Sequence, residues 1–270
     1  METNVRMAGY DTGGFAAMKQ EKRQEIILYA VMRSGYVSID SLAEELGVSS
    51  QTIRRDLAVM DRQGMLERRP GGASCRTTIL NSSYENRQVE DLKDKERIAR
   101  AIAEYIPDNC SIFLTLGTTT EVIANALLCR SGLMIITNNT VAALTLNKKS
   151  DFEVVLTSGY MRKSSHGLVG ASTIDFVNGF QCDYLITSAG GINESDGCLV
   201  DFHTADVSVA QAMMQHSGKV LLAISPGKFG RHAVIRFAPM KSVDMLFTCD
   251  PVPARLSELA EKSGVNIVTC

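Results

Sequence analysis

The stretch from Ser49 to Gly64 reads SSQTIRRDLAVMDRQG, and its pattern decides the fold of the amino-terminal part of the chain. Ile53, Leu57 and Met60 stand at i, i+4 and i+7, which is the spacing of a helix with one buried face. Serine at the start suits an amino-terminal cap, and glycine at the end suits the first residue beyond the helix. The spacing therefore predicts a short amphipathic helix that carries two adjacent arginines on its outer side.

Two further helices and a hairpin flank this stretch. Residues 20–34 place apolar side chains at helical spacing, and SLAEEL follows Asp40, which is a suitable amino-terminal cap. Gly47 breaks that second helix, and MLERRPGGA after the third helix supplies a short strand start and a basic turn. Three short helices followed by a basic hairpin predict a winged helix-turn-helix over residues 19–74.

The outer side of the third helix and the hairpin carry side chains that suit DNA. Arginine can donate two hydrogen bonds to guanine, glutamine can pair with adenine, and serine or threonine can reach phosphate. Between Gly47 and Arg76 six basic residues outweigh three acidic ones, so this region is cationic within an anionic protein. A solvated charged face is the alternative interpretation of the arginine pair taken alone. The candidate DNA contacts are Ser49, Ser50, Gln51, Thr52, Arg54, Arg55, Arg68, Arg69, Gly71 and Gly72.

The remainder of the chain follows a different pattern. Residues 75–92 are polar without a sustained period and are predicted to form a linker. Residues 1–18 are predicted to form a disordered tail, with Met18 as an alternative start of translation. Over residues 93–270, continuous apolar runs such as SIFLTL, LMIIT and KVLLAI alternate with helical segments. This alternation predicts an α/β domain with a mostly parallel sheet that is covered on both faces.

Loops rich in glycine and hydroxyl residues follow several of these predicted strands. In an open parallel sheet, ligands collect at the carboxyl edge, and such loops present backbone amides to a phosphate group. Any single loop of this kind also suits a helix cap, so the prediction of an anion site depends on several loops meeting at one edge. Lys228, Arg162 and Arg231 are candidates for charge complementarity to an anion, with a solvated surface position as the alternative for each.

Composition excludes several classes of protein. The chain has 270 residues, 45% of them hydrophobic, and a net charge of −2, which gives no global attraction to nucleic acid or membrane. Seven cysteines stand singly without metal-ligand spacing, which argues against a disulfide framework and zinc and favours the reducing cytoplasm. No apolar run approaches the roughly 20 residues that span a bilayer. We therefore expect no metal, no cofactor and no membrane partner.

The motif TIRRDL with a trailing GGA resembles the signature of the DeoR family of bacterial transcriptional regulators. KERIARAIAEYIPD, LGTTTEVIANALL and GKFGRHA extend this resemblance over nearly all of residues 19–270. It implies that the carboxy-terminal domain has a ribose-5-phosphate-isomerase-like fold and senses a phosphorylated sugar or polyol, glycerol 3-phosphate being one candidate. The positions that match the family's effector pattern are Gly117, Thr118, Thr119, Thr120, Asn138, Asn139, Gly159, Arg162, Gly190, Gly191 and Lys228.

The chain also departs from the family pattern. Thr115 and Ser225 stand where acidic residues are usual, Asp206 replaces a glutamate, and Ala210 replaces a lysine. On the wing, Pro70 stands where histidine is usual, which removes a donor and stiffens the turn. These changes lead to the hypothesis that the effector differs from glycerol 3-phosphate, or that sensing is weaker.

The sequence thus predicts a cytoplasmic repressor of a carbohydrate or polyol catabolic operon, released from operator DNA by a phosphorylated sugar or related anion. A single module makes few contacts, so a homodimer or homotetramer is expected. A sugar-phosphate isomerase-like enzyme is one alternative, but it needs a carboxylate base that Thr115 and Ser225 do not supply. The other alternative is a DNA-binding regulator or activator with a vestigial effector pocket.

Overall fold

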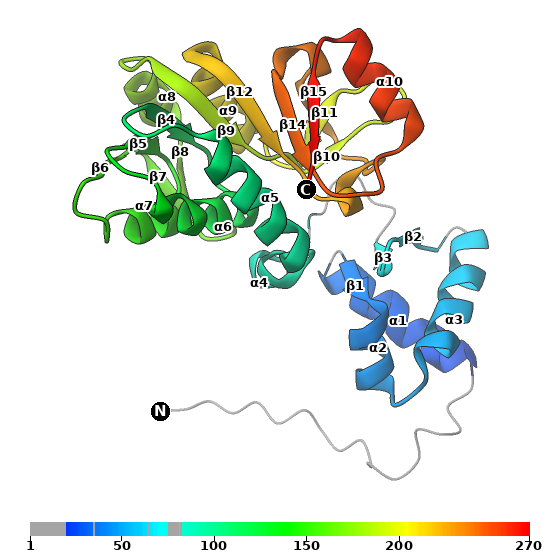
Figure 1. Ribbon diagram of the computed structural model, residues 1–270. Helices are drawn as coiled ribbons and strands as arrows, with labels where there is room; N and C mark the ends of the chain where they lie inside the picture. Colours follow the sequence, from blue (N-terminus) through cyan, green and yellow to red (C-terminus); the bar gives the residue numbers. More distant parts are fainter. Residues whose placement is uncertain (1–19, 35, 64, 75–80, 82) are drawn as a thin grey trace, which may run out of the picture. The chain divides into compact units, whose positions relative to one another are not determined.

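The computed structural model describes residues 20–34, 36–63, 65–74, 81 and 83–270. The predictions made for residues 1–18 and for Gly64 lie outside these ranges. The chain divides into two compact units with the boundary between Arg76 and Thr77 (Figure 1).

Within its described residues, the first unit is built from three helices and a small antiparallel sheet. Its helices are α1 (Gln20–Ser34), α2 (Ile39–Leu46) and α3 (Ser50–Arg62), and its strands are β1 (Tyr36–Ser38), β2 (Glu67–Arg69) and β3 (Gly72–Ser74). The strand order is β1-β3-β2, so the hairpin of β2 and β3 is joined to the helices through β1. This arrangement is a winged helix-turn-helix and confirms the fold predicted for this part of the chain.

One apolar cluster holds the first unit together. Ile53, Leu57 and Met60 of α3 are fully buried in it, as their spacing predicts. A buried ion pair between Arg23 Nε and Asp56 Oδ2, at 2.5 Å, joins α1 to the same helix. Removing Arg23 would take this partner from the Asp56 carboxylate, which is 2% exposed as a side chain, and should be strongly destabilising.

The turns of the first unit follow from local chemistry. Gly47 has φ +61°, the left-handed conformation that glycine adopts without strain, and it ends α2 before the turn into α3. The cap of α2 is Ser38, whose hydroxyl accepts a hydrogen bond from the Ser41 amide at 3.0 Å. The prediction of Asp40 as this cap is wrong, because pairing of β1 with β3 keeps Ser38 extended and the helix begins directly after it.

The second unit is an α/β domain around a seven-stranded sheet. The sheet order is β15-β14-β12-β9-β4-β5-β6, and every pairing in it is parallel. Its strands are β4 (Ser111–Leu114), β5 (Met134–Thr137), β6 (Glu153–Leu156), β9 (Cys182–Thr187), β12 (Ser217–Ala223), β14 (Met245–Thr248) and β15 (Asn266–Thr269). Its helices are α4 (Tyr84–Val89), α5 (Leu92–Tyr105), α6 (Thr118–Ala126), α7 (Thr140–Leu146), α8 (Ala171–Val177), α9 (Thr204–Gln215) and α10 (Ala254–Lys262).

Two smaller antiparallel sheets and three short 3-10 helices complete the part of the second unit that the structure describes. The smaller strands are β7 (Tyr160–Arg162), β8 (Gly167–Val169), β10 (Gly191–Ile192), β11 (Leu199–Asp201) and β13 (Ile235–Ala238). The 3-10 helices are η2 (Leu127–Cys129), η3 (Pro226–Lys228) and η4 (Met240–Ser242).

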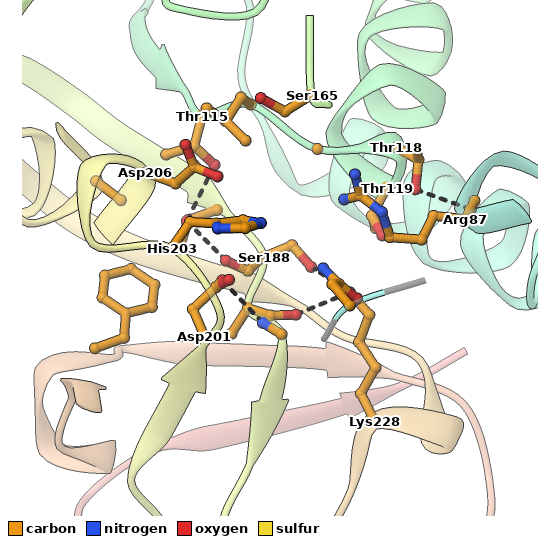
Figure 2. Close-up of a pocket in the computed structure, with 18 of the residues that line it drawn as sticks. Arg87, Thr115, Thr118, Thr119, Ser165, Ser188, Asp201, His203, Asp206 and Lys228 are labelled. Atoms are coloured by element: carbon orange, nitrogen blue, oxygen red, sulfur yellow. Dashed lines mark hydrogen bonds between the residues drawn. The ribbon is translucent and has the colours of Figure 1, made fainter. Parts of the chain in front are cut away.

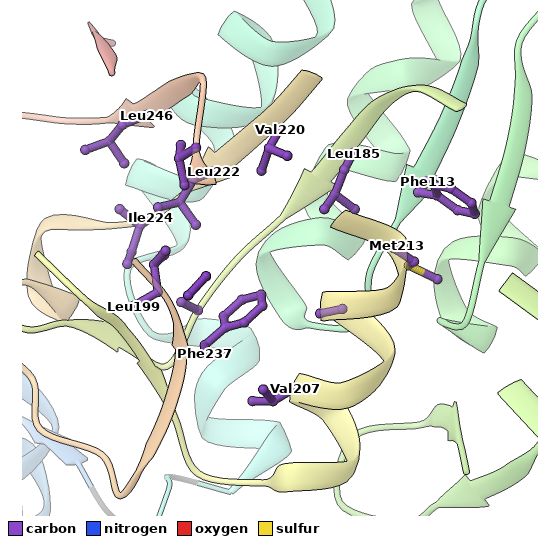
Figure 3. Packing of buried hydrophobic residues seen from close by; sticks show 14 of the residues in the cluster. Phe113, Leu185, Leu199, Val207, Met213, Val220, Leu222, Ile224, Phe237 and Leu246 are labelled. Atoms are coloured by element: carbon purple, nitrogen blue, oxygen red, sulfur yellow. The ribbon is translucent and has the colours of Figure 1, made fainter. Parts of the chain in front are cut away.

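The middle of the large sheet is buried on both faces, so its central strands carry mostly apolar side chains. Along β4, Ile112 and Leu114 belong to one apolar cluster and Phe113 to the other, because successive side chains point to opposite faces. Helices α5, α6 and α7 pack in the first cluster, and α8, α9 and α10 in the second. Figure 3 shows the second cluster, in which Val207 and Met213 of α9 lie against side chains from the central strands. This two-sided parallel sheet confirms the predicted α/β architecture.

The structure differs from the sequence-based prediction in the segment before α5. Residues 75–92 are predicted to be a linker, yet α4 spans Tyr84–Val89 and α5 begins at Leu92. A helix of six residues is too short to show a periodic pattern, and isolated helices of this length are unstable in water. Tertiary contacts supply its stability instead: Tyr84 is 7% exposed, and its hydroxyl donates to Glu121 Oε2 of α6 at 2.8 Å.

Candidate functional site

The outer face of α3 carries exposed polar and cationic side chains within the first unit. Its apolar side packs inward, while Gln51, Arg54 and Arg55 are exposed near its amino-terminal end. The structure shows no hydrogen bond or ion pair from either guanidinium to another described residue. Two unengaged arginines on a rigid helix have the donor geometry that reads guanine edges or phosphates in a DNA groove.

Two of the predicted DNA contacts, Ser49 and Ser50, also make contacts within the turn before α3. The Ser49 hydroxyl caps the helix by accepting from the Thr52 amide at 3.2 Å, and it lies 2.9 Å from the Thr52 hydroxyl. The Ser50 hydroxyl donates to Asp40 Oδ1 of α2 at 3.3 Å. These contacts orient the exposed arginines relative to the rest of the unit.

The wing is the hairpin formed by β2 and β3, and its two predicted arginines differ in their surroundings. Arg68 is exposed, whereas Arg69 is half-buried and forms an ion pair with Glu67 at 3.0 Å. Gly71 has φ +73°, the left-handed conformation required at the tip of the hairpin. A Cβ atom on Gly72 would lie 2.2 Å from the Val37 carbonyl oxygen, so glycine is needed there for β3 to pair with β1. Arg69 and Gly72 therefore build the wing.

A pocket of about 870 Å³, part of it open to solvent, lies at the carboxyl edge of the parallel sheet in the second unit. The loops that follow β4, β9 and β12 line it, and these three strands are neighbours in the sheet. Residues from the α4–α5 segment and from α9 close its other sides. The carboxyl edge is the predicted place for a ligand in an open parallel sheet.

The amino end of α6 forms one wall of this pocket. Gly117 precedes the helix with φ +140°, and Thr118 and Thr119 in its first turn line the cavity. The first backbone amides of a helix have no partner within it and carry a partial positive charge, so this wall suits an anion.

Among the described residues, four cationic side chains line the pocket: Arg87, Lys95, Lys228 and Arg231. In Figure 2, Arg87, His203 and Lys228 extend into the same space from α4, from the loop before α9 and from η3. The Lys228 amine donates to the Ala189 carbonyl at 2.8 Å and to the Ser188 hydroxyl at 3.2 Å. Burial, with Lys95 and Arg231 nearby, lowers the pKa of Lys228 to about 7. An anion in the pocket would supply the negative charge that this cluster needs.

Three of the pocket acids are engaged in contacts within the protein. Asp91 accepts a hydrogen bond from the Ser225 hydroxyl at 2.7 Å, and Asp201 accepts from the Gly190 amide at 3.0 Å. Asp206 forms an ion pair with Arg162 at 2.8 Å, although burial raises the pKa of this carboxyl to about 6. Together these carboxylates fix the loops around the pocket.

The structure brings about half of the predicted effector residues to the pocket. Those that line it are Gly117, Thr118, Thr119, Asn138, Gly190 and Lys228. Those that do not are Thr120, Asn139, Gly159, Arg162 and Gly191.

The predicted residues outside the lining have structural contacts. The Thr120 hydroxyl donates to the carbonyls of Thr115 and Gly117, each at 2.7 Å. Asn139 caps α7 by accepting from two amides of its first turn, each at 3.1 Å. Gly159 and Gly191 sit where an added Cβ would clash, against Thr173 and the Arg231 carbonyl respectively.

Sequence reasoning missed several residues of the pocket. Arg87 and Asp91 lie in the segment assigned to a linker, and Lys95 belongs to a charged run that is typical of a solvated helix face. Lys95 is nevertheless 2% exposed, because α5 packs against α6. Asp201 and His203 precede α9. A signal in the sequence could have identified Asp201 as a pocket residue, because it stands directly at the end of a strand.

Two negative findings concern the described residues alone. Among them, there is no group of three or more histidine, cysteine or acidic side chains that could hold a metal ion. Within the same part of the chain, every helix is too short or too polar to cross a membrane.

Comparison with known proteins places both units in one family. Residues 23–78 match the DeoR-like helix-turn-helix domain, and residues 90–250 match the DeoR C terminal sensor domain. The glycerol-3-phosphate regulon repressor of Escherichia coli (strain K12) is 37% identical over 253 residues, covering 94% of this chain and 100% of the relative. The HTH-type transcriptional repressor CsqR of the same strain is 38% identical over 246 residues, covering 91% and 94%.

Solved structures resemble this chain only at low similarity. Ribose 5-phosphate isomerase A from Methanocaldococcus jannaschii has a TM-score of 0.39 at 11% identity, covering 52% of this chain and 55% of that one. A translation initiation factor eIF-2B from Pyrococcus horikoshii OT3 has a TM-score of 0.45 at 15% identity, covering 86% and 82%. At these scores the likeness is too weak to support a conclusion about function.

Proposed function

Because the chain belongs to the DeoR family, we propose that it is a transcriptional repressor whose DNA binding is controlled by a phosphorylated sugar, polyol or related anionic metabolite. The observation that carries this proposal is the pairing, in one chain, of unengaged arginines on α3 with a pocket at the sheet edge that four cations line. The regulated genes are proposed to be a carbohydrate or polyol catabolic operon, and the protein acts in the cytoplasm, where that DNA lies.

For the DNA-binding unit, we propose that α3 enters the major groove. Gln51, Arg54 and Arg55 are placed to reach base edges, and Thr52 and Arg68 to reach phosphates. The remaining predicted contacts, Ser49, Ser50, Arg69, Gly71 and Gly72, are proposed to hold these side chains in place. Two copies of the unit in a homodimer, or four in a homotetramer, would meet half-sites about 34–36 Å apart or a multiple of that.

For the sensing unit, we propose that the anionic group of the effector lies at the amino end of α6. The free amides of its first turn and the nearby Lys228 are the groups that bind it. Because this pocket includes Arg87 and Lys95, we propose that the sensing unit begins before α4, earlier than residue 93. Thr115 and Ser225 at the strand ends in place of acids favour an effector other than glycerol 3-phosphate.

Catalysis is disfavoured by the same geometry. An isomerase needs a carboxylate within reach of the substrate to take a proton. Thr115, Thr187 and Ser225 occupy the strand ends at the pocket, and Asp201 and Asp206 are held by contacts with the protein. We therefore propose a regulator that binds its ligand without converting it.

The experiment starts with genome-wide mapping of bound DNA, followed by gel shifts at physiological salt with the mapped fragment and a random duplex. We expect a preference for the mapped fragment of about 10³-fold or more, and its loss with one member of a panel of phosphorylated and sulfonated sugars. Equal affinity for both duplexes would contradict the proposal. Specific binding that no metabolite weakens would favour a regulator with a vestigial pocket, and ketose formation from ribose 5-phosphate would favour an enzyme.

A further inference from the structure

The backbone of α4 is attached to the effector pocket through the carbonyl of Arg87. This carbonyl accepts a hydrogen bond from the Thr118 hydroxyl at 3.0 Å and another from the Lys95 ammonium. Lys95 Nζ also donates to the Thr118 hydroxyl at 3.2 Å. Lys95 is 2% exposed and Thr118 is 7% exposed, so water competes little for these donors. The pocket thus uses two of its own donors to hold a neighbouring helix.

An anion at the amino end of α6 needs the same two donors. Thr118 is the first residue of that helix, next to its free amides. A threonine hydroxyl has one proton, so it can donate either to the Arg87 carbonyl or to the anion, but not to both. Burial lowers the pKa of Lys95, which reflects the cost of a charge enclosed by protein, and a phosphate would attract this ammonium more strongly than a neutral carbonyl does.

The side chain of Arg87 offers the anion a new partner. Its Nη2 atom donates to the Ser164 carbonyl at 2.9 Å, but its Nε atom is buried and has no hydrogen-bond partner among the described residues. The hydroxyl of Ser165, a residue that is 3% exposed, is likewise without a partner in this part of the chain. Both residues line the pocket (Figure 2). Buried polar atoms that stay unpaired destabilise a fold, so two of them facing one cavity indicate a ligand contact.

We infer that α4 is the element through which the pocket controls the DNA-binding unit. An anionic effector takes the Thr118 hydroxyl and the Lys95 ammonium from the Arg87 carbonyl, binds the Arg87 side chain, and so displaces the carboxyl-terminal end of α4. This inference rests on the proposed function. Since α4 is the first helix after the unit boundary at Arg76, a displacement of α4 acts on the segment of chain that leads to the DNA-binding unit.

The other end of α4 remains attached during this change. Tyr84 donates to Glu121 at 2.8 Å, and its ring lies edge-on to His166 with 4.4 Å between centroids. Neither contact involves the donors that the anion takes. Effector binding therefore turns α4 about Tyr84, with the largest movement at Arg87, and the helix does not detach as a whole.

Hydrogen–deuterium exchange of the full-length protein, free of DNA, tests this inference with inorganic phosphate as the probe. Sodium phosphate is compared with sodium chloride at equal ionic strength. We expect amides at the carboxyl end of α4 to exchange faster by a factor of about three or more, and amides in the first turn of α6 to exchange more slowly. Unchanged or slower exchange in α4 while the α6 amides respond would overturn the inference, and so would the absence of any response in both.

Two variants with matched controls sharpen the test. In Thr118→Val, α4 should exchange faster without phosphate than it does in the wild type, because the Arg87 carbonyl keeps Lys95 but loses the hydroxyl donor. Thr145→Val, which loses a hydroxyl-to-carbonyl bond within α7, should leave α4 unchanged. Arg87→Gln should weaken phosphate binding about tenfold, whereas Arg100→Gln, an exposed change on α5, should not. Equal effects of a variant and its control would contradict the inference. If a metabolite released the protein from DNA without any change in the exchange of α4, this inference alone would be refuted. If the protein showed no specific DNA binding, the proposed function would be refuted.

Discussion

The two units present their functional residues in opposite ways. In the first unit, α3 turns Ile53, Leu57 and Met60 into the core and leaves Arg54 and Arg55 in solvent, so one helix separates folding from recognition. In the second unit, the pocket residues also hold the fold, as Thr118 and Lys95 do when they bind the Arg87 carbonyl. Substitutions should therefore separate stability from binding in the first unit and couple them in the second.

Loss of a core side chain in the first unit should have the largest effect. Leu57→Ala should lower the free energy of unfolding of this unit by about 2–5 kcal/mol, because Leu57 is fully buried in a core of ten residues in the described chain. Hydrogen exchange should then show lost protection in α3 and retained protection in β9 of the second unit. DNA binding should be lost while effector binding persists. Simultaneous loss of protection in both units would contradict their energetic independence.

The affinity of the pocket for a phosphomonoester should depend on pH. Lys228 has a pKa of about 7, far below its ordinary value, because of burial and neighbouring cations. A bound anion favours the protonated amine, so binding above pH 7 must take up a proton, and the affinity should fall about tenfold per pH unit between pH 7 and 9. Below pH 7 the amine is already protonated, and this dependence should disappear.

Calorimetry across this pH range measures the effect, and proton uptake is checked by comparing buffers with different ionisation enthalpies. Lys228→Met, which keeps the apolar stem, should bind more weakly with a flat pH profile. A wild-type affinity that is constant from pH 7 to 9 would show that Lys228 does not meet the anion.

On the outer face of α3, the loss of operator affinity caused by an arginine substitution should depend on the position of that arginine along the helix. Arg55→Ala should weaken operator binding by about 1–3 kcal/mol without changing stability, because the side chain is exposed and unengaged. Arg62→Ala is the matched control, since Arg62 is also exposed but lies in the last turn and donates to the Ala58 carbonyl of its own helix. Fluorescence anisotropy with a labelled operator distinguishes the two. An equal loss in both variants would indicate general electrostatic attraction and contradict base readout by the amino-terminal end.

The smallest expected effect concerns Asn139, which sequence similarity assigns to the effector. Its side chain caps α7, so Asn139→Ala should cost about 1 kcal/mol of stability, and Asn139→Ser, which keeps a capping oxygen without adding a charge, should cost less. Effector affinity should change little in either variant. Thermal denaturation and calorimetry on the same samples provide the measurement. A large loss of affinity in Asn139→Ser, at little changed stability, would move Asn139 into the pocket.

The contrast between the units also explains what could be predicted from the sequence. The arginine face of α3 follows from local spacing, because the positions that point inward define those that point outward. The carboxyl edge of the sheet was equally predictable, and Thr118, Gly190 and Lys228 do meet there. Both predictions use only the geometry of a single element or of a parallel sheet.

The remaining pocket residues depend on tertiary packing. Lys95 has the sequence environment of a surface helix and becomes buried only because α5 packs on α6. Arg87 lies on a helix that is too short to leave a periodic signal. Conversely, Asn139 and Thr120 match an effector pattern, yet their polar atoms are used by neighbouring backbone groups. No spacing rule distinguishes a ligand contact from a helix cap at such positions.

The central claim is that occupation of the pocket controls DNA binding by the other unit. Its most direct test is release of a labelled operator during titration with the active metabolite, comparing wild type with Lys228→Met. We predict equal operator affinity for both proteins without metabolite, and a concentration for half-release that is at least about tenfold higher in the variant. Release of both proteins at the same concentration would contradict the claim.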